Sequence, residues 1–238
     1  MLRALTLLIL LLPNLAQATC RQALVLALDV SGSVNDDEYW LQINGLADAL
    51  DTPHIRELIL SGGDAHLRLA VFEWSSQNHQ RLILPWSKLS SNEAINTVIK
   101  RIRTHKKQRQ GLKTAIGRAQ QYALGLLQDQ QDCWQHIIDV SADGKNNSGP
   151  LPTAVYAHPD FRDVTVNVLV VNDPNEATAK IKKASKANLD AYFAREVLHG
   201  AGAFTQETAG YEDYARAMRK KLEREISIPV IGALESFS

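Results

Sequence analysis

The 238-residue chain has no net charge and lacks several motifs that mark common enzyme classes. Its 26 basic residues balance 26 acidic ones, so composition gives no reason to expect nucleic acid or an anionic lipid surface as a partner. The seven histidines include no pair at the i, i+4 spacing of a helical zinc site, which argues against a zinc hydrolase. There is also no Gly-x-Ser-x-Gly turn and no glycine-rich phosphate loop.

Long apolar runs are missing everywhere except at the start of the chain. Residues 1–18 are typical of a secretory signal peptide, with Arg3 at the positive end, an apolar stretch to Leu15 and Ala16-Gln17-Ala18 as the cleavage site. The stretch is shorter than the roughly 20 residues that span a bilayer, although an uncleaved anchor is the alternative. We therefore expect a periplasmic or secreted protein with no transmembrane span after cleavage.

The remaining residues, 19–238, are enough for one α/β domain with a well-buried core. Apolar runs and helical periodicities alternate along this part of the chain, which predicts a doubly wound sheet. The expected strands are 23–28, 67–74, 81–86, 137–141, 164–171 and 203–205. The expected helices are 36–51, 54–60, one opened by a capping box at 90–93, 114–127, 189–199 and 211–226.

A short polar motif follows the first of these strands. Residues 23–28 are apolar, and Asp29-Val30-Ser31-Gly32-Ser33 comes directly after them. Ligands of open parallel sheets bind beyond the carboxyl ends of the strands, so this position suits a binding site. One carboxylate and two hydroxyls are hard oxygen ligands, which favour Mg²⁺, Mn²⁺ or Ca²⁺ over zinc or copper. We take Mg²⁺ as the first choice.

Two more oxygen-bearing residues stand at comparable places further along the chain. Thr114 opens a predicted helix, and Asp143 follows a predicted strand and precedes Gly144. The alternative is that Asp29 and Ser31 only cap the next helix. That alternative leaves Thr114 and Asp143 without a role.

In identity and order these residues resemble the metal-ion-dependent adhesion site (MIDAS) of von Willebrand factor A (vWA) domains. The resemblance implies three hydroxyl ligands and two carboxylates that hold a divalent cation directly or through water. It also implies a mostly parallel sheet with one antiparallel edge strand, here residues 81–86, in a single vWA-like domain. The implied metal-site residues are Asp29, Ser31, Ser33, Thr114 and Asp143.

The chain is most similar to a family of secreted bacterial vWA-like proteins with no assigned function. The features that carry this similarity are the run from Asp143 to Gly149 and the late stretch 188–204. One residue departs from the wider pattern, because Ala142 stands where many A domains have a threonine before the final Asp-Gly. No hydroxyl can assist the ion from that position.

The two cysteines become informative once export is expected, because an oxidising compartment permits a disulfide. Cys20 lies nine residues before Asp29, and Cys133 lies ten before Asp143. In vWA domains the first and fourth strands are parallel neighbours, so the resemblance implies that the two cysteines meet at the opposite edge of the sheet. A disulfide Cys20–Cys133 is the prediction, and two unpaired thiols are the alternative.

Polar and basic residues flank the predicted metal site. Lys113, Asn146, Asn147 and Ser148 are candidates for contact with a partner, although turn chemistry accounts equally well for the three last. A basic run could guide an acidic partner to the site, or could simply be a solvated helix end. This run consists of Lys100, Arg101, Arg103, Lys106, Lys107, Arg109 and Lys113.

Two classes of function are compatible with such a site. The first is an exported, non-enzymatic binding module whose cation is completed by an Asp or Glu of a partner protein, because an ion held mostly by hydroxyls and water keeps much of its charge. The second is a metal-dependent phosphatase or hydrolase that uses Asp29. An aspartyl-phosphate enzyme would want a second acid two residues after the first, and Ser31 stands there instead.

Other conspicuous side chains are expected to be structural. Asp139, in the middle of a predicted strand, should be a hydrogen-bonded core or outer acid rather than a direct ligand. The four tryptophans fall in or beside predicted elements and are expected in the core. They are Trp40, Trp74, Trp86 and Trp134.

Overall fold

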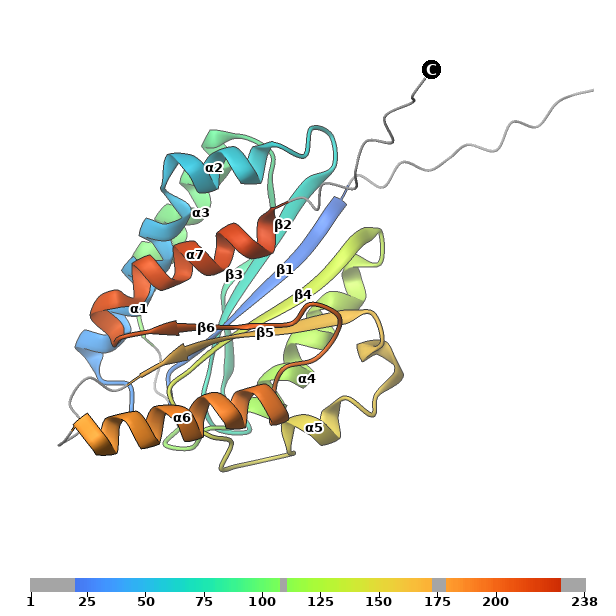
Figure 1. The fold of residues 1–238 in the computed structure, drawn as a ribbon. Helices are drawn as coiled ribbons and strands as arrows, with labels where there is room; N and C mark the ends of the chain where they lie inside the picture. Colours follow the sequence, from blue (N-terminus) through green and yellow to red (C-terminus); the bar gives the residue numbers. More distant parts are fainter. Residues whose placement is uncertain (1–19, 108–110, 173–178, 228–238) are drawn as a thin grey trace, which may run out of the picture.

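The computed structural model describes residues 20–107, 111–172 and 179–227, so the predicted signal peptide lies outside the described residues. A six-stranded sheet in the order β3-β2-β1-β4-β5-β6 forms the centre of the domain (Figure 1). The strands are β1 (Cys20–Asp29), β2 (His66–Trp74), β3 (Gln80–Leu89), β4 (Cys133–Ala142), β5 (Val164–Val171) and β6 (Thr205–Thr208). The strand β3 is antiparallel to β2, and the other neighbouring pairs are parallel. The predicted fold class is confirmed.

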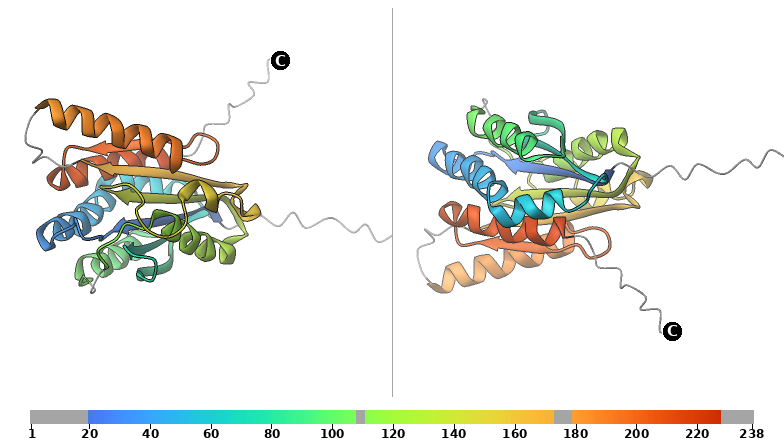
Figure 2. Two further views of the ribbon diagram at one scale, coloured as in Figure 1. Left: turned by 90° about the horizontal axis from the view of Figure 1, so that it is seen from below. Right: turned by 90° about the horizontal axis from the view of Figure 1, so that it is seen from above.

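Helices cover both faces of this sheet. The helices are α1 (Asp36–Leu50), α2 (Pro53–Leu60), α3 (Asn92–Thr104), α4 (Ile116–Leu127), α5 (Pro152–Val155), α6 (Ala179–Glu196) and α7 (Tyr214–Ile226). Figures 1 and 2 show α1, α2, α3 and α7 on one face and α4, α5 and α6 on the other. No helix within the described ranges is both long enough and apolar enough to cross a membrane.

The sheet is buried on both faces because its strands are apolar on both faces. Along β1 the residues Leu24, Leu26 and Leu28 belong to one core, and the alternate residues Ala23 and Val25 belong to the other. Side chains alternate between faces along a strand, so one continuous apolar run supplies both cores. This is why the parallel strands could be recognised from sequence.

The observed elements differ from the predicted ones in their bounds, since the last strand is Thr205–Thr208 rather than 203–205 and β4 begins at Cys133 rather than at residue 137. The helix α6 begins at Ala179, ten residues before the expected Leu189, and α4 begins at Ile116 rather than Thr114. The expected capping box at 90–93 is wrong in register, because Ser91 is the cap and accepts a hydrogen bond from the backbone N–H of Ala94. A true capping box joins Asn35 and Glu38 at the start of α1.

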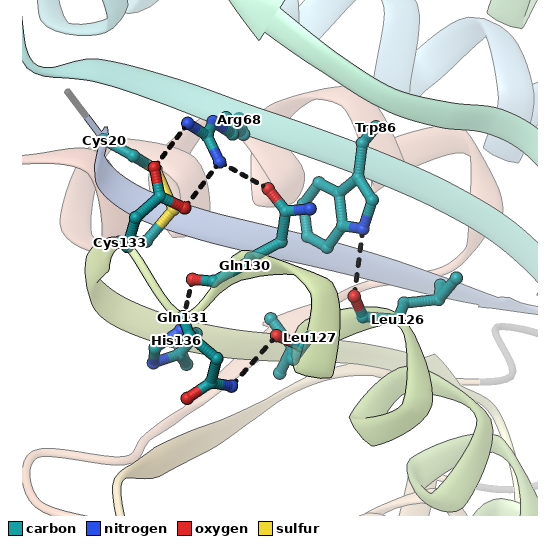
Figure 3. Close-up of a disulfide and its surroundings, with 10 residues drawn as sticks. Cys20, Arg68, Trp86, Leu126, Leu127, Gln130, Gln131, Cys133 and His136 are labelled. Carbon is teal, nitrogen blue, oxygen red and sulfur yellow. Dashed lines mark hydrogen bonds and ion pairs between the residues drawn. A yellow bond between two sulfur atoms is a disulfide. The ribbon is translucent and has the colours of Figure 1, made fainter.

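The disulfide Cys20–Cys133 is present at the edge of the sheet where β1 and β4 begin (Figure 3). The two residues are register partners in neighbouring parallel strands, and their Cα atoms are 4.5 Å apart. Beside them Arg68 makes two hydrogen bonds to the carboxylate of Asp132, at 2.7 and 2.9 Å, and one to Gln130. The prediction of the disulfide is confirmed.

The tryptophans are not all in the core. Trp74 is fully buried and Trp86 is partly buried, with its indole N–H donating to the backbone oxygen of Leu126. Trp40 and Trp134 are 63% and 65% exposed, so the prediction is wrong for these two. Both stand at positions of a helix and a strand that face away from the core, which the residue type alone does not reveal.

Asp139 pairs with a lysine beneath α7. The Lys221 ammonium lies 2.9 Å from Asp139 and 2.5 Å from Glu225, and all three side chains are buried. The amide of Asn167 donates to Glu225 at 2.7 Å. Asp139 is therefore a core acid, as expected, and it belongs to a buried ion cluster of Asp139, Lys221 and Glu225.

Candidate metal centre

The site forms where the direction of chain winding changes. The loops after β1 and β4 leave the same edge of the sheet, and these strands are neighbours, with Leu28 opposite Ser141. The crossover from β1 leads to β2 on one side, whereas β4 is followed by β5 on the other. Open α/β sheets bind ligands at such a switch point. Asp29 and Asp143 are brought together here from positions 114 residues apart in the sequence.

Three of the predicted ligands form a connected set of oxygen atoms. The hydroxyl oxygens of Ser31 and Ser33 are 3.2 Å apart, and the Ser33 hydroxyl donates to Asp143 Oδ1 at 3.0 Å. The backbone N–H of Ser31 donates to Asp29 Oδ1 at 2.7 Å, which fixes that carboxylate in the turn. The sequence spacing has therefore placed two carboxylates and two hydroxyls at one point.

The loop that carries Thr114 packs against the loop of Ser31 and Ser33. Leu112 of this loop packs against Gly32, where an added Cβ would lie 3.1 Å from the Leu112 backbone oxygen. The backbone N–H of Thr114 donates to Asn147 Oδ1, and the N–H of Asn147 donates to the Thr114 backbone oxygen, both at 2.9 Å. This reciprocal pair ties the Thr114 loop to the loop that follows Asp143.

Burial leaves one carboxylate oxygen of the site without a partner. Asp29 is 1% exposed, and its Oδ2 is buried and accepts no hydrogen bond. The pKa of Asp29 is well above its ordinary value, first because of burial and second because of the nearby charge of Asp143. Burial also raises the pKa of Asp143, whereas the hydrogen bond from Ser33 lowers it. Within the described residues no lysine or arginine forms an ion pair with either acid.

These features fit a hard divalent cation. A buried oxygen with no partner is costly, and a cation bound beside it would remove that cost and allow both carboxylates to ionise. Carboxylate and hydroxyl oxygens are the donors that Mg²⁺ and Ca²⁺ accept. In the part of the chain that is described, no group of three or more His, Cys, Asp or Glu side chains could hold a metal. The hydroxyls would therefore have to contribute to any ion bound here.

Tyr211 is a part of the site that the sequence did not indicate. Its hydroxyl donates to Asp143 Oδ2 at 3.4 Å, and its pKa is raised first by burial and then by the charge of Asp143. The sequence placed Tyr211 on the apolar face of a helix, but it lies in a short 3-10 turn before α7. Only the packing of α7 against the sheet brings it to Asp143, so no local signal could have found it.

The polar residues predicted to contact a partner already form hydrogen bonds that hold the loops around the site. Asn146 Oδ1 accepts from the backbone N–H of Gly117 at 3.4 Å, and the Ser148 hydroxyl accepts from Gln77 at 3.3 Å. Together with Asn147 they hold the turn that presents Thr114. Lys113 is exposed beside the site, and its backbone N–H donates to the hydroxyl of Ser76. Their contact with a partner stays a prediction.

Three of the six described residues of the basic run are paired with acids or donate hydrogen bonds to backbone oxygens. Arg103 pairs with Asp48 at 2.6 Å, and Arg101 donates to the backbone oxygen of Ile83. Lys107 donates to the backbone oxygen of Val34 and pairs with Asp36. Arg109 lies outside the described residues. The contacts of Arg101, Arg103 and Lys107 favour a structural role for the described part of the run.

Solved structures with this fold include several vWA proteins. A mussel byssus protein, proximal thread matrix protein 1, "with zinc occupied MIDAS motif", is 15% identical with a TM-score of 0.57, over 88% of this chain and 46% of its own. A von Willebrand factor type A protein from Catenulispora acidiphila is 15% identical with a TM-score of 0.54, over 87% and 43%. The pilus adhesin SpaC from Lactobacillus rhamnosus GG is 10% identical with a TM-score of 0.55, over 88% and 31%.

The chain thus spans less than half the length of each of these three structures. At such identities the similarity shows the fold, which is that of a vWA domain. No curated protein matches the sequence. A family described as "Protein of unknown function (DUF1194)" matches residues 19–230.

Proposed function

Because the chain belongs to the DUF1194 family, which carries no functional description, we propose its function from the geometry of the metal centre. It is an exported, non-enzymatic module that binds one divalent cation and, through that cation, an Asp or Glu of a partner protein. The buried, unpartnered Oδ2 of Asp29 is the observation that carries the proposal. The hydroxyls of Ser31 and Ser33 and the carboxylate of Asp143, which are linked by hydrogen bonds, would supply further donors to a cation bound at that oxygen.

The ligand set explains why a partner carboxylate would follow the ion. Asp29 and Asp143 supply two negative charges, and Ser31, Ser33 and Thr114 supply neutral hydroxyls. An ion held in this way keeps an open position and a strong attraction for an anionic oxygen. Mg²⁺ is the expected ion, and Mn²⁺ or Ca²⁺ would meet the same donors. The zinc in the mussel protein supports the choice of a divalent cation and does not select among these.

Export is the second part of the proposal. The disulfide Cys20–Cys133 supports it, because such bonds persist in oxidising compartments. The predicted signal peptide at residues 1–18 supports it independently. We expect the mature chain in a periplasm or outside the cell.

A phosphatase or hydrolase that uses Asp29 is the competing function. Asp29 is 1% exposed and its Oδ1 is already engaged by the backbone of Ser31, which leaves little access for nucleophilic attack. The absence of a second acid two residues later also weighs against it. Panels of phosphate esters and carboxylic esters, assayed with added Mg²⁺ and Mn²⁺, separate the two classes, and metal-dependent turnover lost in Asp29→Ala would favour the enzyme.

Calorimetric titration of the mature protein with Mg²⁺ and Mn²⁺ tests the metal site. We expect one binding event in the wild type and none in Asp29→Ala, which should stay folded because Asp29 lies at the edge of the sheet. Asp37→Ala is the matched control, since Asp37 is an exposed acid in the first turn of α1. Unchanged metal binding by Asp29→Ala, with circular dichroism showing a folded chain, would refute the assignment.

A further inference from the structure

Two exposed leucines lie on the loops around the metal centre. Leu112 is 79% exposed and Leu151 is 61% exposed. The other exposed large apolar residues in the described part of the chain are Trp40, Leu82 and Trp134, which belong to α1, β3 and β4. Single exposed apolar residues need no explanation. Two leucines on separate loops of the same site are a more specific observation.

The two leucines lie beside chain positions that precede and follow Thr114 in the sequence. Leu112 stands two residues before Thr114, and its Cδ2 is 3.2 Å from the position that a Cβ on Gly32 would take, between Ser31 and Ser33. The carbonyl carbon of Leu151 is 3.3 Å from the Cβ position of Gly117, which stands three residues after Thr114, in the first turn of α4.

The loops that carry these leucines are held firmly in place. The N–H of Gly111 donates to the Ser75 hydroxyl at 3.0 Å, and the N–H of Ala115 donates to the Ser75 backbone oxygen at 2.8 Å. The loop before Leu151 is tied by the Asn147 contacts to Thr114. A leucine presented on a fixed backbone loses little entropy on binding, so it can contribute to affinity.

Charge is distributed unevenly around the site. On the side of α1 the exposed acids Asp36 and Asp37 precede Glu38, whose charge raises the pKa of Asp143. On the loops that carry the two leucines and at the start of α4, the described residues include three exposed basic side chains. These are Lys113, Arg118 and Lys145.

An acidic ligand would therefore be repelled from the α1 side and attracted to the leucine side. Lys113 follows Leu112 directly, and within the described residues no acid pairs with it. Arg118 and Lys145 are used in part, since they contact Gln121 and Asn188 respectively. The charge pattern thus selects the side on which a partner lies.

We propose that the partner is an extended protein segment in which an Asp or Glu is flanked, within a few residues on each side, by apolar side chains that cover Leu112 and Leu151. This inference rests on the proposed function, because the acidic residue is the one that would meet the cation. An extended chain advances about 3.3 Å per residue, so a short segment can follow the rim past Thr114 in both directions. The acidic residues of α1 make an anionic membrane surface an unsuitable occupant.

Selection from a phage-displayed library of random peptides tests the proposal. The mature protein is immobilised with Mg²⁺, and bound phage are eluted with a chelator, so that only metal-dependent binders are recovered. We expect the recovered peptides to contain an Asp or Glu with Leu, Ile, Val, Met or Phe nearby on both sides. One such peptide, made synthetically, is then used as the probe for the variants.

Leu112→Ser and Leu151→Ser should each weaken the probe by about tenfold or more, which corresponds to 1.4 kcal/mol and to the lower range for burying one leucine. Mg²⁺ binding measured by calorimetry should be unchanged in both. Trp134→Ser is the matched control, because Trp134 is similarly exposed where β4 begins, at the opposite edge of the sheet. It should bind the probe as the wild type does.

The outcomes separate this inference from the proposed function. Recovered peptides that share an acid but no flanking apolar residue would overturn the inference and leave the metal-dependent module intact, and so would leucine variants that bind the probe normally. A failure to recover any peptide from a protein that does bind Mg²⁺ would also overturn it. Recovered peptides that bind the Mg²⁺-loaded protein without a carboxylate would contradict the proposed function itself.

Discussion

Two groups of buried or partly buried acids in the described part of the domain have opposite surroundings. Asp29 and Asp143 lie at the carboxyl edge of the sheet, and within the described residues no basic side chain pairs with them. Asp139 and Glu225 lie under α7 with the Lys221 ammonium between them. Under the proposed function the first group would take its cation from solution, whereas the second has the ammonium of Lys221.

The comparison indicates what separates a structural acid from a binding acid in this fold. Both groups are removed from water, and this burial raises the pKa of Asp29 and of Asp139 alike. At the ion cluster the lysine opposes that shift. At the metal centre the nearby charge of Asp143 increases it. The two groups therefore differ in the charge beside the buried carboxylate, which is positive at the ion cluster and negative at the candidate metal centre.

The largest expected effect concerns the disulfide Cys20–Cys133, which joins β1 and β4 at the edge of the sheet opposite the candidate metal centre. Replacing Cys20 and Cys133 by serine should lower the free energy of unfolding by roughly 4 to 5 kcal/mol, an upper figure from the entropy of closing a 113-residue loop. Urea denaturation of the exported protein measures it. Intact mass with and without reductant is the control, and two alkylatable thiols in the native protein would contradict the bond.

The next prediction removes the Lys221 ammonium from the ion cluster. Lys221→Met leaves Asp139 and Glu225 buried without a counter-charge, and breaking a buried pair in this way costs about 3 to 5 kcal/mol. Urea denaturation is again the measurement. Adding Asp139→Leu and Glu225→Leu should restore much of the loss, since apolar replacement of a whole buried cluster is often close to neutral. If Lys221→Met had unchanged stability, Lys221 would not be the group that stabilises Asp139 and Glu225 in the core.

The ion cluster should also respond to pH. Burial, opposed by Lys221 and helped by Glu225, raises the pKa of Asp139 to about 7. An acid whose pKa is raised in the folded state binds a proton more tightly there, so its contribution to stability is lost as pH rises from about 4 to about 7. Asp139→Asn removes this titration. The difference in unfolding free energy between wild type and Asp139→Asn, measured with a chelator present, should therefore fall across that interval, and a constant difference would contradict it.

The smallest expected effect separates metal from partner at the open site. Thr114→Ala should reduce affinity for an acidic peptide by about tenfold and affinity for Mg²⁺ much less, if the threonine tightens on the ion when a carboxylate arrives. Calorimetry with Mg²⁺ alone, and then with peptide in the presence of Mg²⁺, measures both. Equal losses of the two affinities would show that Thr114 is an ordinary ligand.

The comparison also bears on movement of the last helix. Some A domains couple their metal site to sliding of this helix, and from that resemblance we expect α7 to respond to ligand. The Lys221 contacts with Asp139 favour one register, because a shift of α7 would separate buried charges. Tyr211, just before α7, contacts Asp143 and provides a route for coupling. Movement of α7 stays a prediction that hydrogen exchange over residues 205–226 can test.

The sequence by itself determined a doubly wound sheet, and the resemblance added its antiparallel edge strand, the disulfide and the five candidate ligands. Apolar runs identify strands buried on both faces, and the loop after such a strand must lie at an edge, so Asp29 and Asp143 could be placed from local pattern. The MIDAS resemblance supplied the pairing of β1 with β4. Helix starts were less certain, as α4 and α6 show, because several neighbouring residues can end a loop equally well.

Only the tertiary structure decided which side chains meet across the domain. Tyr211 reaches Asp143, Lys221 lies between Asp139 and Glu225, and Leu112 packs on Gly32 because distant elements dock in one arrangement. Periodicity reports whether a residue faces inward or outward, and it carries no information on which inward residue is opposite. The exposure of Trp40 and Trp134 was missed for a different reason, because residue type was taken as a sign of burial, and a large apolar side chain can also stand at an exposed position.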